Sequence, residues 1–120
     1  MKAILIDVTA RTVTDIELPP GLQAMYNAIG CSCVDRITID SRNDVWIDDS
    51  GLLHDPQPPK FQFFGAANVI AGNGLICGYS PAGETISTTL RAEQVRPFIV
   101  FLGDVPVDPD PILILSWDDQ

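Results

Sequence analysis

Ten prolines divide this chain of 120 residues into short segments, so it cannot build its fold from long helices or long strands. Pro19, Pro20 and Gly21 end the first run of strand-forming residues. Three prolines within 56–59 forbid a helix there and most ladder hydrogen bonds, which predicts a surface loop over 54–59. A chain of this length makes one domain.

The segments between these breaks have clear apolar patterns. Residues 2–8 and 12–18 are rich in β-branched residues and flank a polar break, which predicts a hairpin. Residues 22–29 carry apolar side chains at spacings of three and four, which predicts an amphipathic helix that ends at Gly30. Residues 34–47 predict a second hairpin around a turn-rich centre.

The second half of the chain predicts a strand and a further helix. A tight turn at Asn73–Gly74, which requires a positive φ, precedes a strand over 75–79. Thr88 or Thr89 can N-cap a helix that continues towards residue 102. Because Pro97 lies within it, we expect either a kinked helix or a short helix that turns into a strand. The whole pattern predicts an α+β fold: a small, mostly antiparallel sheet built from hairpins, with one or two helices packed on it.

The final residues differ from the rest. We divide the chain into an α+β domain over 1–103 and a segment of the same domain over 104–120, which begins as an acidic, proline-rich spacer. The segment ends in an apolar strand that is too hydrophobic to remain in water. This strand either joins the sheet of its own chain or pairs with another chain, for example as a homodimer. Its apolar residues are Ile112, Leu113, Ile114, Leu115 and Trp117.

The charge of the chain restricts its partners. Sixteen acidic residues against seven basic ones give a net charge of −9, which repels phosphate backbones and anionic lipids. We therefore expect no direct nucleic-acid binding. No apolar stretch approaches the roughly 18 residues that a membrane span needs, so we also expect no membrane binding.

Ten of the sixteen acids lie in two short windows. The first window contains Asp40, Asp44, Asp48, Asp49 and Asp55, and the second contains Asp104, Asp108, Asp110, Asp118 and Asp119. If the two windows share a face, their field would steer the protein to a basic groove of a partner, such as one built to hold DNA or RNA. The alternative is that these acids fill loops and keep the protein soluble.

The cysteines and the lone histidine give no sign of a metal or cofactor site. Three cysteines are an odd number, and the spacing of Cys31 and Cys33 suits neither a disulfide nor a CxxC zinc site, so we expect free thiols in a reducing cytoplasm. The apolar start of the chain is too short for a signal peptide. The acids after Asp40 lack the glycine and glutamate of a calcium-binding EF-hand loop.

No residue set predicts a reaction, and we favour a protein without catalytic activity. The alternative is a small enzyme or ligand-binding domain with a site near Asp48, Asp49 and His54, beside the glycine-rich turn at 72–74. That alternative requires the histidine and the two aspartates to converge within hydrogen-bonding distance.

Several short blocks carry a resemblance to a known family. They are MKAILIDVTARTVT, LQAMYNAIGCSCVDRITID, VWIDDSGLL, FQFFG and IAGNGLICG, in this order. Over roughly residues 1–102 the chain resembles an uncharacterised family, a domain of unknown function, of small proteins from phages, plasmids and conjugative elements. Pro97 departs from the uninterrupted helix-like pattern of that family.

The resemblance implies an origin in a mobile element and a location in the bacterial cytoplasm, and it supplies no catalytic residues. Together with the acidic windows, it leads to the hypothesis of a non-enzymatic phage or plasmid accessory protein that binds a host protein. The partner expected is a nucleic-acid-binding defence complex. The chain would inhibit it, as an anti-CRISPR or antirestriction protein does, through an acidic surface that mimics nucleic acid.

Overall fold

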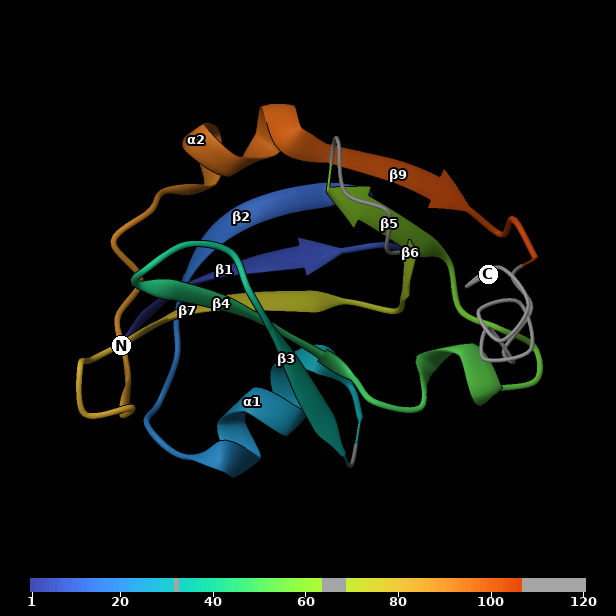
Figure 1. Cartoon of the computed structure of the whole chain (residues 1–120). Coiled ribbons are helices and arrows are strands. Elements are labelled where there is room, and N and C mark those ends of the chain that lie inside the picture. Colours follow the sequence, from blue (N-terminus) through green and yellow to red (C-terminus); the bar gives the residue numbers. More distant parts are fainter. Residues whose placement is uncertain (32, 64–68, 107–120) are drawn as a thin grey trace, which may run out of the picture.

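The computed structural model describes residues 1–31, 33–63 and 69–106, which form two antiparallel sheets and two short α-helices (Figure 1). The elements are β1 (Lys2–Asp7), β2 (Thr12–Glu17), α1 (Leu22–Ile29), β3 (Val34–Thr38), β4 (Asn43–Asp48), the 3-10 turn η1 (Gly51–Leu53), β5 (Lys60–Phe63), β6 (Val69–Ala71), β7 (Gly74–Tyr79), β8 (Thr85–Ile86), α2 (Ala92–Val95), the 3-10 turn η2 (Arg96–Phe98) and β9 (Ile99–Gly103). The predicted α+β class is confirmed.

Some predictions concern residues outside this description. They are the second-window acids Asp108, Asp110, Asp118 and Asp119 and the apolar residues Ile112, Leu113, Ile114, Leu115 and Trp117. No helix in the described ranges is long and apolar enough to cross a membrane.

The larger sheet contains both predicted hairpins. Its strand order is β2-β1-β7-β4-β3, with β8 paired to the end of β7, and the smaller sheet has the order β6-β5-β9. Lys2 pairs with Glu17 in the first hairpin and Val34 with Asp48 in the second. Strand β7 lies between the two hairpins and pairs with β1 and β4, so it holds the larger sheet together.

Both faces of the larger sheet are covered, which makes the domain three layers thick (Figure 1). On one face, Met25 and Ile29 of α1 pack on Leu75 and Cys77 of β7. Helix α1 ends at Gly30 as predicted, where a left-handed φ of 84° lets the amide bond to the carbonyl of Tyr26. On the other face lie the smaller sheet and α2, and the core there contains Ile4, Ile6, Val13, Val45, Phe61, Ile76 and Val95.

The expected tight turn at Asn73–Gly74 is wrong in its details. Strands β6 and β7 belong to different sheets, so the chain turns a corner between layers and forms no hairpin. The positive φ belongs to Gly72, at 93°. Gly74 is needed for another reason: a Cβ there would come within 2.7 Å of the Phe61 ring, which packs across the two sheets.

Of the two alternatives for 91–102, a short helix followed by a strand is confirmed. Helix α2 is one turn long, Pro97 lies in η2, and β9 begins at Ile99. The predicted caps are wrong, because Arg91 occupies the N-cap position and its backbone amide donates to the side chain of Gln94. Arg96 fixes the turn by donating to the carbonyl of Val13 at 2.7 Å.

Thr88 and Thr89 instead bind Asn43, a polar residue that is 1% exposed. The Asn43 amide nitrogen donates to Thr89 and to Asp40, and its oxygen accepts from the Thr88 hydroxyl at 2.6 Å and from the Thr89 backbone amide. Every hydrogen-bonding site of this buried amide therefore has a partner. The network ties the start of β4 to the segment that leads into α2.

Replacing Asn43 with alanine should lower the free energy of unfolding by about 2 kcal/mol, because the buried Thr88 hydroxyl loses its acceptor. Urea denaturation of the full chain measures the change. Asn27→Ala, on the exposed side of α1, is the matched control and should change stability by less than about 0.5 kcal/mol. Equal effects of the two variants would contradict the network's role.

Candidate functional site

The most specific polar feature of the described structure is a histidine paired with an aspartate at the end of β4. The Nε2 atom of His54 lies 2.8 Å from Oδ2 of Asp48, and Oδ1 of Asp48 accepts a hydrogen bond from the backbone amide of Ser50. The Asp48 side chain is only 12% exposed, whereas that of His54 is 52% exposed. The aspartate therefore fixes the orientation of the imidazole, and the other ring nitrogen remains for a ligand or for solvent.

The local fold brings these two residues together. Asp48 ends β4, the turn η1 reverses the chain, and His54 follows it directly. Gly51 allows η1 to lie against β6, because a Cβ there would collide with the carbonyl oxygen of Ala71. Gln57 then donates to the carbonyl of Leu52 and closes the loop. The turn residues were visible in the sequence, but this 2.8 Å contact was not.

The pair forms part of the wall of two open pockets. One pocket, of about 460 Å³, lies between the β1–β2 turn and the proline-rich loop, and its lining includes Thr9, Asp55 and Asn73. The other, of about 550 Å³, lies beside the end of α1 and is lined by Tyr26, Cys31 and Ser50 among others. Neither lining contains lysine or arginine, so these pockets suit a neutral polar or cationic ligand.

The structure brings together some of the residues of the predicted ligand site. His54 and Asp48 converge within hydrogen-bonding distance, and Gly72 and Asn73 of the glycine-rich turn line the first pocket. Asp49 does not join them: it is exposed and lines neither pocket. Within the described ranges, no group of three acidic, histidine or cysteine side chains could hold a metal ion.

Two thiols, Cys31 beside this site and Cys77 in the core of the domain, are poor nucleophiles. Burial, followed by the charge of Asp48, raises the pKa of Cys31. Burial and then the charge of Asp44 raise the pKa of Cys77 to about 11. Both thiols are therefore more protonated near neutral pH than an ordinary cysteine, which argues against a Cys–His catalytic pair.

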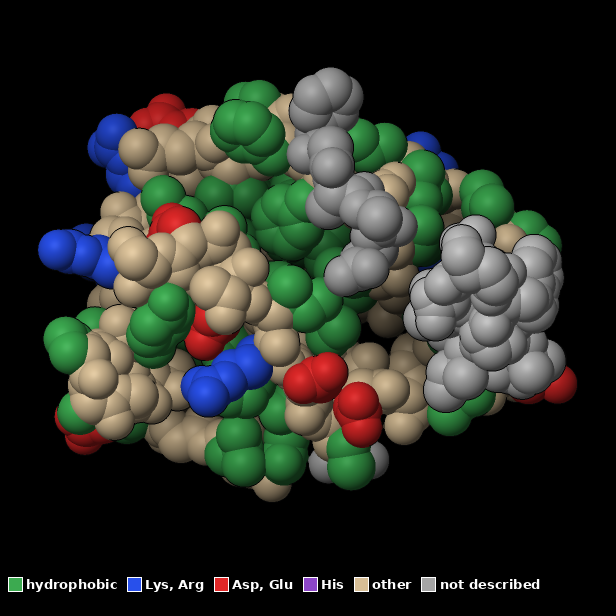
Figure 2. Space-filling view, viewed as in Figure 1, with side chains coloured by type: hydrophobic (Ala, Val, Ile, Leu, Met, Phe, Trp, Pro, Cys, Tyr) green, Lys and Arg blue, Asp and Glu red, His purple; other side chains and the backbone are tan. Residues whose placement is uncertain are grey.

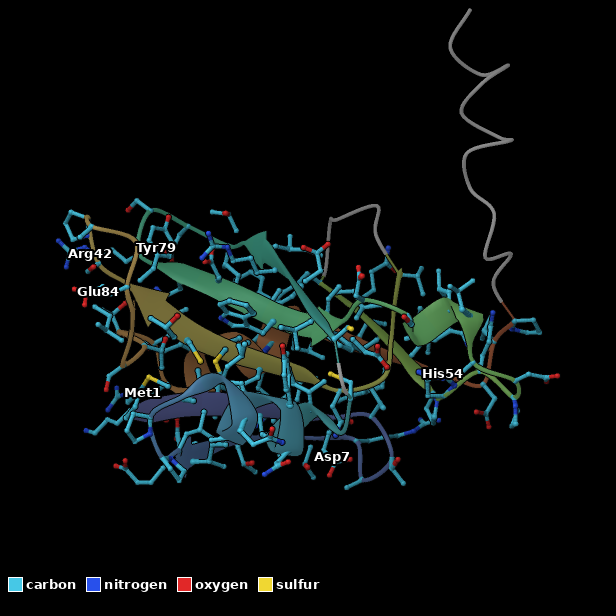
Figure 3. All side chains as sticks on the ribbon, turned by 90° about the horizontal axis from the view of Figure 1, so that it is seen from below. Met1, Asp7, Arg42, His54, Tyr79 and Glu84 are labelled. Atoms are coloured by element: carbon cyan, nitrogen blue, oxygen red, sulfur yellow. The ribbon has the colours of Figure 1, made fainter. Side chains whose placement is uncertain are left out.

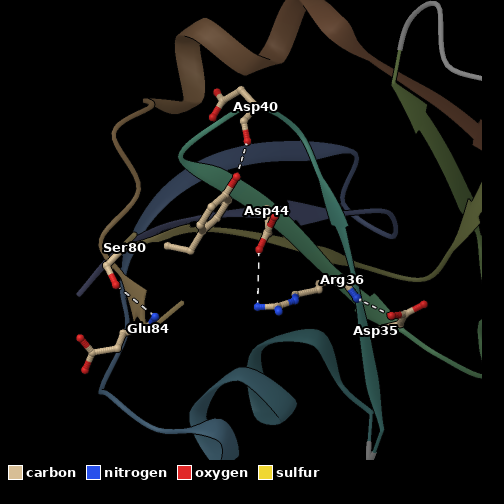
Figure 4. Close-up of polar contacts among 7 residues, drawn as sticks. Asp35, Arg36, Asp40, Asp44, Ser80 and Glu84 are labelled. Atoms are coloured by element: carbon tan, nitrogen blue, oxygen red, sulfur yellow. Dashed lines mark hydrogen bonds and ion pairs between the residues drawn. The ribbon is translucent and has the colours of Figure 1, made fainter. Parts of the chain in front are cut away.

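Three acids of the first window, Asp40, Asp44 and Asp48, make contacts inside the domain. Asp40 accepts hydrogen bonds from the Arg42 backbone amide and the Asn43 side chain, and its own carbonyl accepts from Tyr79 (Figure 4). Asp48 is held by His54 as described. These carboxylates serve the fold, so they are less available to a partner than their number suggests.

Asp44 is the most buried of these acids. Its side chain is 6% exposed, and its Oδ2 lies 3.8 Å from the guanidinium of Arg36 (Figure 4). That guanidinium also lies over the Trp46 ring, 5.5 Å from its centre. Oδ1 of Asp44 has no hydrogen-bond partner among the described residues. The charge of Asp44 therefore lies buried within the sheet, and it is not available at the surface to a partner.

The remaining first-window acids lie near the end of the molecule that carries His54. Asp49 and Asp55 flank the segment containing η1 and His54, and both are exposed. Asp104 is also exposed and follows Gly103, which pairs with Lys60 at the start of β5, so it lies at the same end (Figure 1). Figure 3 places Arg42, Tyr79 and Glu84 at the opposite end from His54. The first window is thus spread along the domain, and acidic side chains are scattered over the face shown in Figure 2.

Comparison with known proteins gave one match. A family model described as "Domain of unknown function (DUF3846)" covers residues 1–99. The match ends close to residue 102, the limit of the resemblance seen in the sequence blocks. Neither the curated proteins nor the solved structures contain a match to the chain.

The three thiols should differ in reactivity in the native full chain. With Cys77 at a pKa of about 11, roughly one molecule in a thousand carries its thiolate at pH 8, and the residue is also buried. A thiol-specific dye at pH 8 should therefore modify exposed Cys33 first, Cys31 more slowly and Cys77 only after unfolding. Cys33→Ser should remove the fast phase. A fast phase that survives this substitution would contradict the assignment.

Proposed function

Because the chain belongs to the DUF3846 family, whose function is unknown, we propose a function from its own surface: it is a non-enzymatic protein that binds a basic surface of another protein. The observation that carries the proposal is the presence of Asp49, Asp55 and Asp104, all exposed, at one end of the domain. Their side chains have no partner among the described residues. Exposed, unpaired carboxylates attract a basic partner without first breaking a contact of their own.

The sequence after the described residues is acidic as well. Asp108, Asp110, Asp118 and Asp119 follow Asp104, and no lysine or arginine occurs after Arg96. Arg11 opposes part of this charge, since its guanidinium lies near Gly103, the neighbour of Asp104. The acidic end consequently keeps an excess of negative charge, which suits a groove that normally holds nucleic acid.

The sequence resemblance supports a more specific form of the proposal. In this form the chain is an accessory protein of a phage or plasmid and works in the bacterial cytoplasm. It occupies the nucleic-acid channel of a host defence complex, such as a CRISPR or restriction complex. The absence of a nucleophile bonded to the His54–Asp48 pair in the described structure favours binding over catalysis.

The test begins with capture of partners from a bacterial host lysate by the full chain, at low and at physiological salt. The captured protein must then lose bound DNA or RNA when the chain is added. Replacing Asp49, Asp55 and Asp104 with asparagine should weaken binding about tenfold, with a larger effect at low salt, because exposed charge pairs contribute modestly and are screened by ions.

The matched control removes three acidic charges elsewhere: Glu17→Gln, Glu84→Gln and Glu93→Gln. This variant should bind the partner almost as tightly as the original chain. Failure to capture a stoichiometric partner at either salt would refute the proposal. So would equal losses of affinity in the two triple variants, or a partner that keeps its nucleic acid.

A second candidate function is the binding of a small cationic or neutral polar molecule beside His54. It is favoured by the 2.8 Å His54–Asp48 contact in the wall common to both pockets. The free ring nitrogen of His54 and the carboxylate of Asp55 both lie at the first pocket and would contact such a ligand.

A nuclear magnetic resonance screen of the full chain with amines, guanidines and polyols tests this candidate. Ligands should shift the amide signals of Gly30, His54 and Asn73, and His54→Ala should weaken binding at least fivefold. Glu84→Gln, at the opposite end, should leave binding unchanged. If millimolar ligands leave these three amides unshifted, the pockets are not a binding site.

A further inference from the structure

The outer strands of the two sheets differ in how they are protected against pairing with another chain. Strand β2 carries Asp15 and Glu17, and β3 carries Asp35 and Arg36. Charged residues and very short length are the usual protections of an edge strand, and β6 and β8 have only three and two residues. Strand β9 has neither protection, because Ile99–Gly103 contains five residues without a charge or a proline.

The free edge of β9 is also accompanied by exposed apolar side chains. Ile99 and Phe101 pack against the core, so the alternation of a strand turns Val100 outward, where it is 39% exposed. Phe98, just before the strand, is 55% exposed. Figure 2 shows hydrophobic side chains along the upper margin, over η2 and β9. Within the described ranges β9 pairs with β5 alone, which leaves its other edge open to a further strand.

The sequence contains a segment suited to this edge. Residues 112–117, outside the described part of the chain, form an uncharged run of the right length and apolar character to add one strand. They follow β9 after a spacer of eight residues, 104–111. The question is whether the spacer lets the segment return to the β9 of its own chain.

The spacer opposes such a return. Pro106, Pro109 and Pro111 have a fixed φ, and the residue before each proline is restricted to extended conformations. Six of the seven residues from 105 to 111 are therefore restricted. An extended stretch of that length spans about 20 Å, whereas a neighbouring strand lies only about 4.8 Å away. A tight hairpin back onto β9 would need the chain to reverse at residues whose φ and ψ the prolines restrict.

From these observations we infer that the β9 edge receives residues 112–117 of a second copy of this chain. The two copies exchange these segments around a twofold axis, and each edge accepts one strand. The added strand pairs with the unprotected backbone groups of β9, and its apolar side chains cover Val100 and Phe98. The extended spacer carries each segment across to the other copy.

The charge of the chain gives this dimer a salt dependence opposite to that of a charge-driven complex. Two copies that each carry a net charge of −9 repel one another, and ions screen that repulsion. Self-association should therefore strengthen between 50 and 500 mM salt, roughly severalfold. The binding of a basic partner by the acidic end should weaken over the same range, so the two proposals can fail separately.

Sedimentation of the full chain should give about twice the chain mass of 13.0 kDa at tens of micromolar protein. Val100→Lys places a charge on the exposed side of β9, and the double variant Leu113→Asp, Leu115→Asp places charges in the segment; each should give monomers. Thr14→Lys, an exposed residue of β2, is the control and should remain dimeric. Circular dichroism establishes that each variant is folded.

Mixing the two monomeric variants tests whether the segment and the edge contact each other. The Val100→Lys copy still has an intact segment, and the double variant still has an intact edge, so the mixture should form a heterodimer. A mixture that stays monomeric overturns the inference. A monomeric full chain also overturns it, and loss of stability on changing 112–117 would then assign the segment to its own sheet.

Discussion

The burial of β7 on both faces is the constraint on which the rest of this domain depends. Its residues from Gly74 to Gly78 are buried, with α1 packed on one face and the smaller sheet on the other. Its hydrogen bonds to β1 and β4 join the two hairpins. Neither hairpin alone could bury enough apolar surface to be stable. The domain is therefore held together by a strand that arrives from outside both hairpins.

Local sequence predicted the elements that depend on local interactions. The two hairpins, the helix ending at Gly30 and the change from helix to strand near Pro97 all follow from spacing, turn residues and proline chemistry, and the structure confirms them. Long-range pairing was not accessible in this way. The sequence around Ala71 and Gly74 does not show that β6 and β7 belong to different sheets, because two strands joined by a short glycine-rich turn are also typical of a hairpin.

The same distinction applies to polar residues. The threonines at 88 and 89 are typical helix caps, yet they bind Asn43, which lies 45 residues or more away in the sequence. Likewise, the sequence gives the number of aspartates but does not separate those with internal partners, such as Asp40 and Asp48, from exposed Asp49. The sequence singled out His54 and Asp48 together, and the fold supplies the contact between them.

The absence of a side chain at Gly74 limits which residues positions 74 and 61 can accept. The Phe61 ring occupies the space that a Cβ would need, so the ring of one sheet and the bare backbone of the other form a pair matched in size. A larger residue at 74 would require the Phe61 ring to move or to be replaced by a smaller side chain, and it would also press on Val45. The sizes of the residues at 61 and 74 are therefore coupled by packing, although the two positions are 13 apart in the sequence.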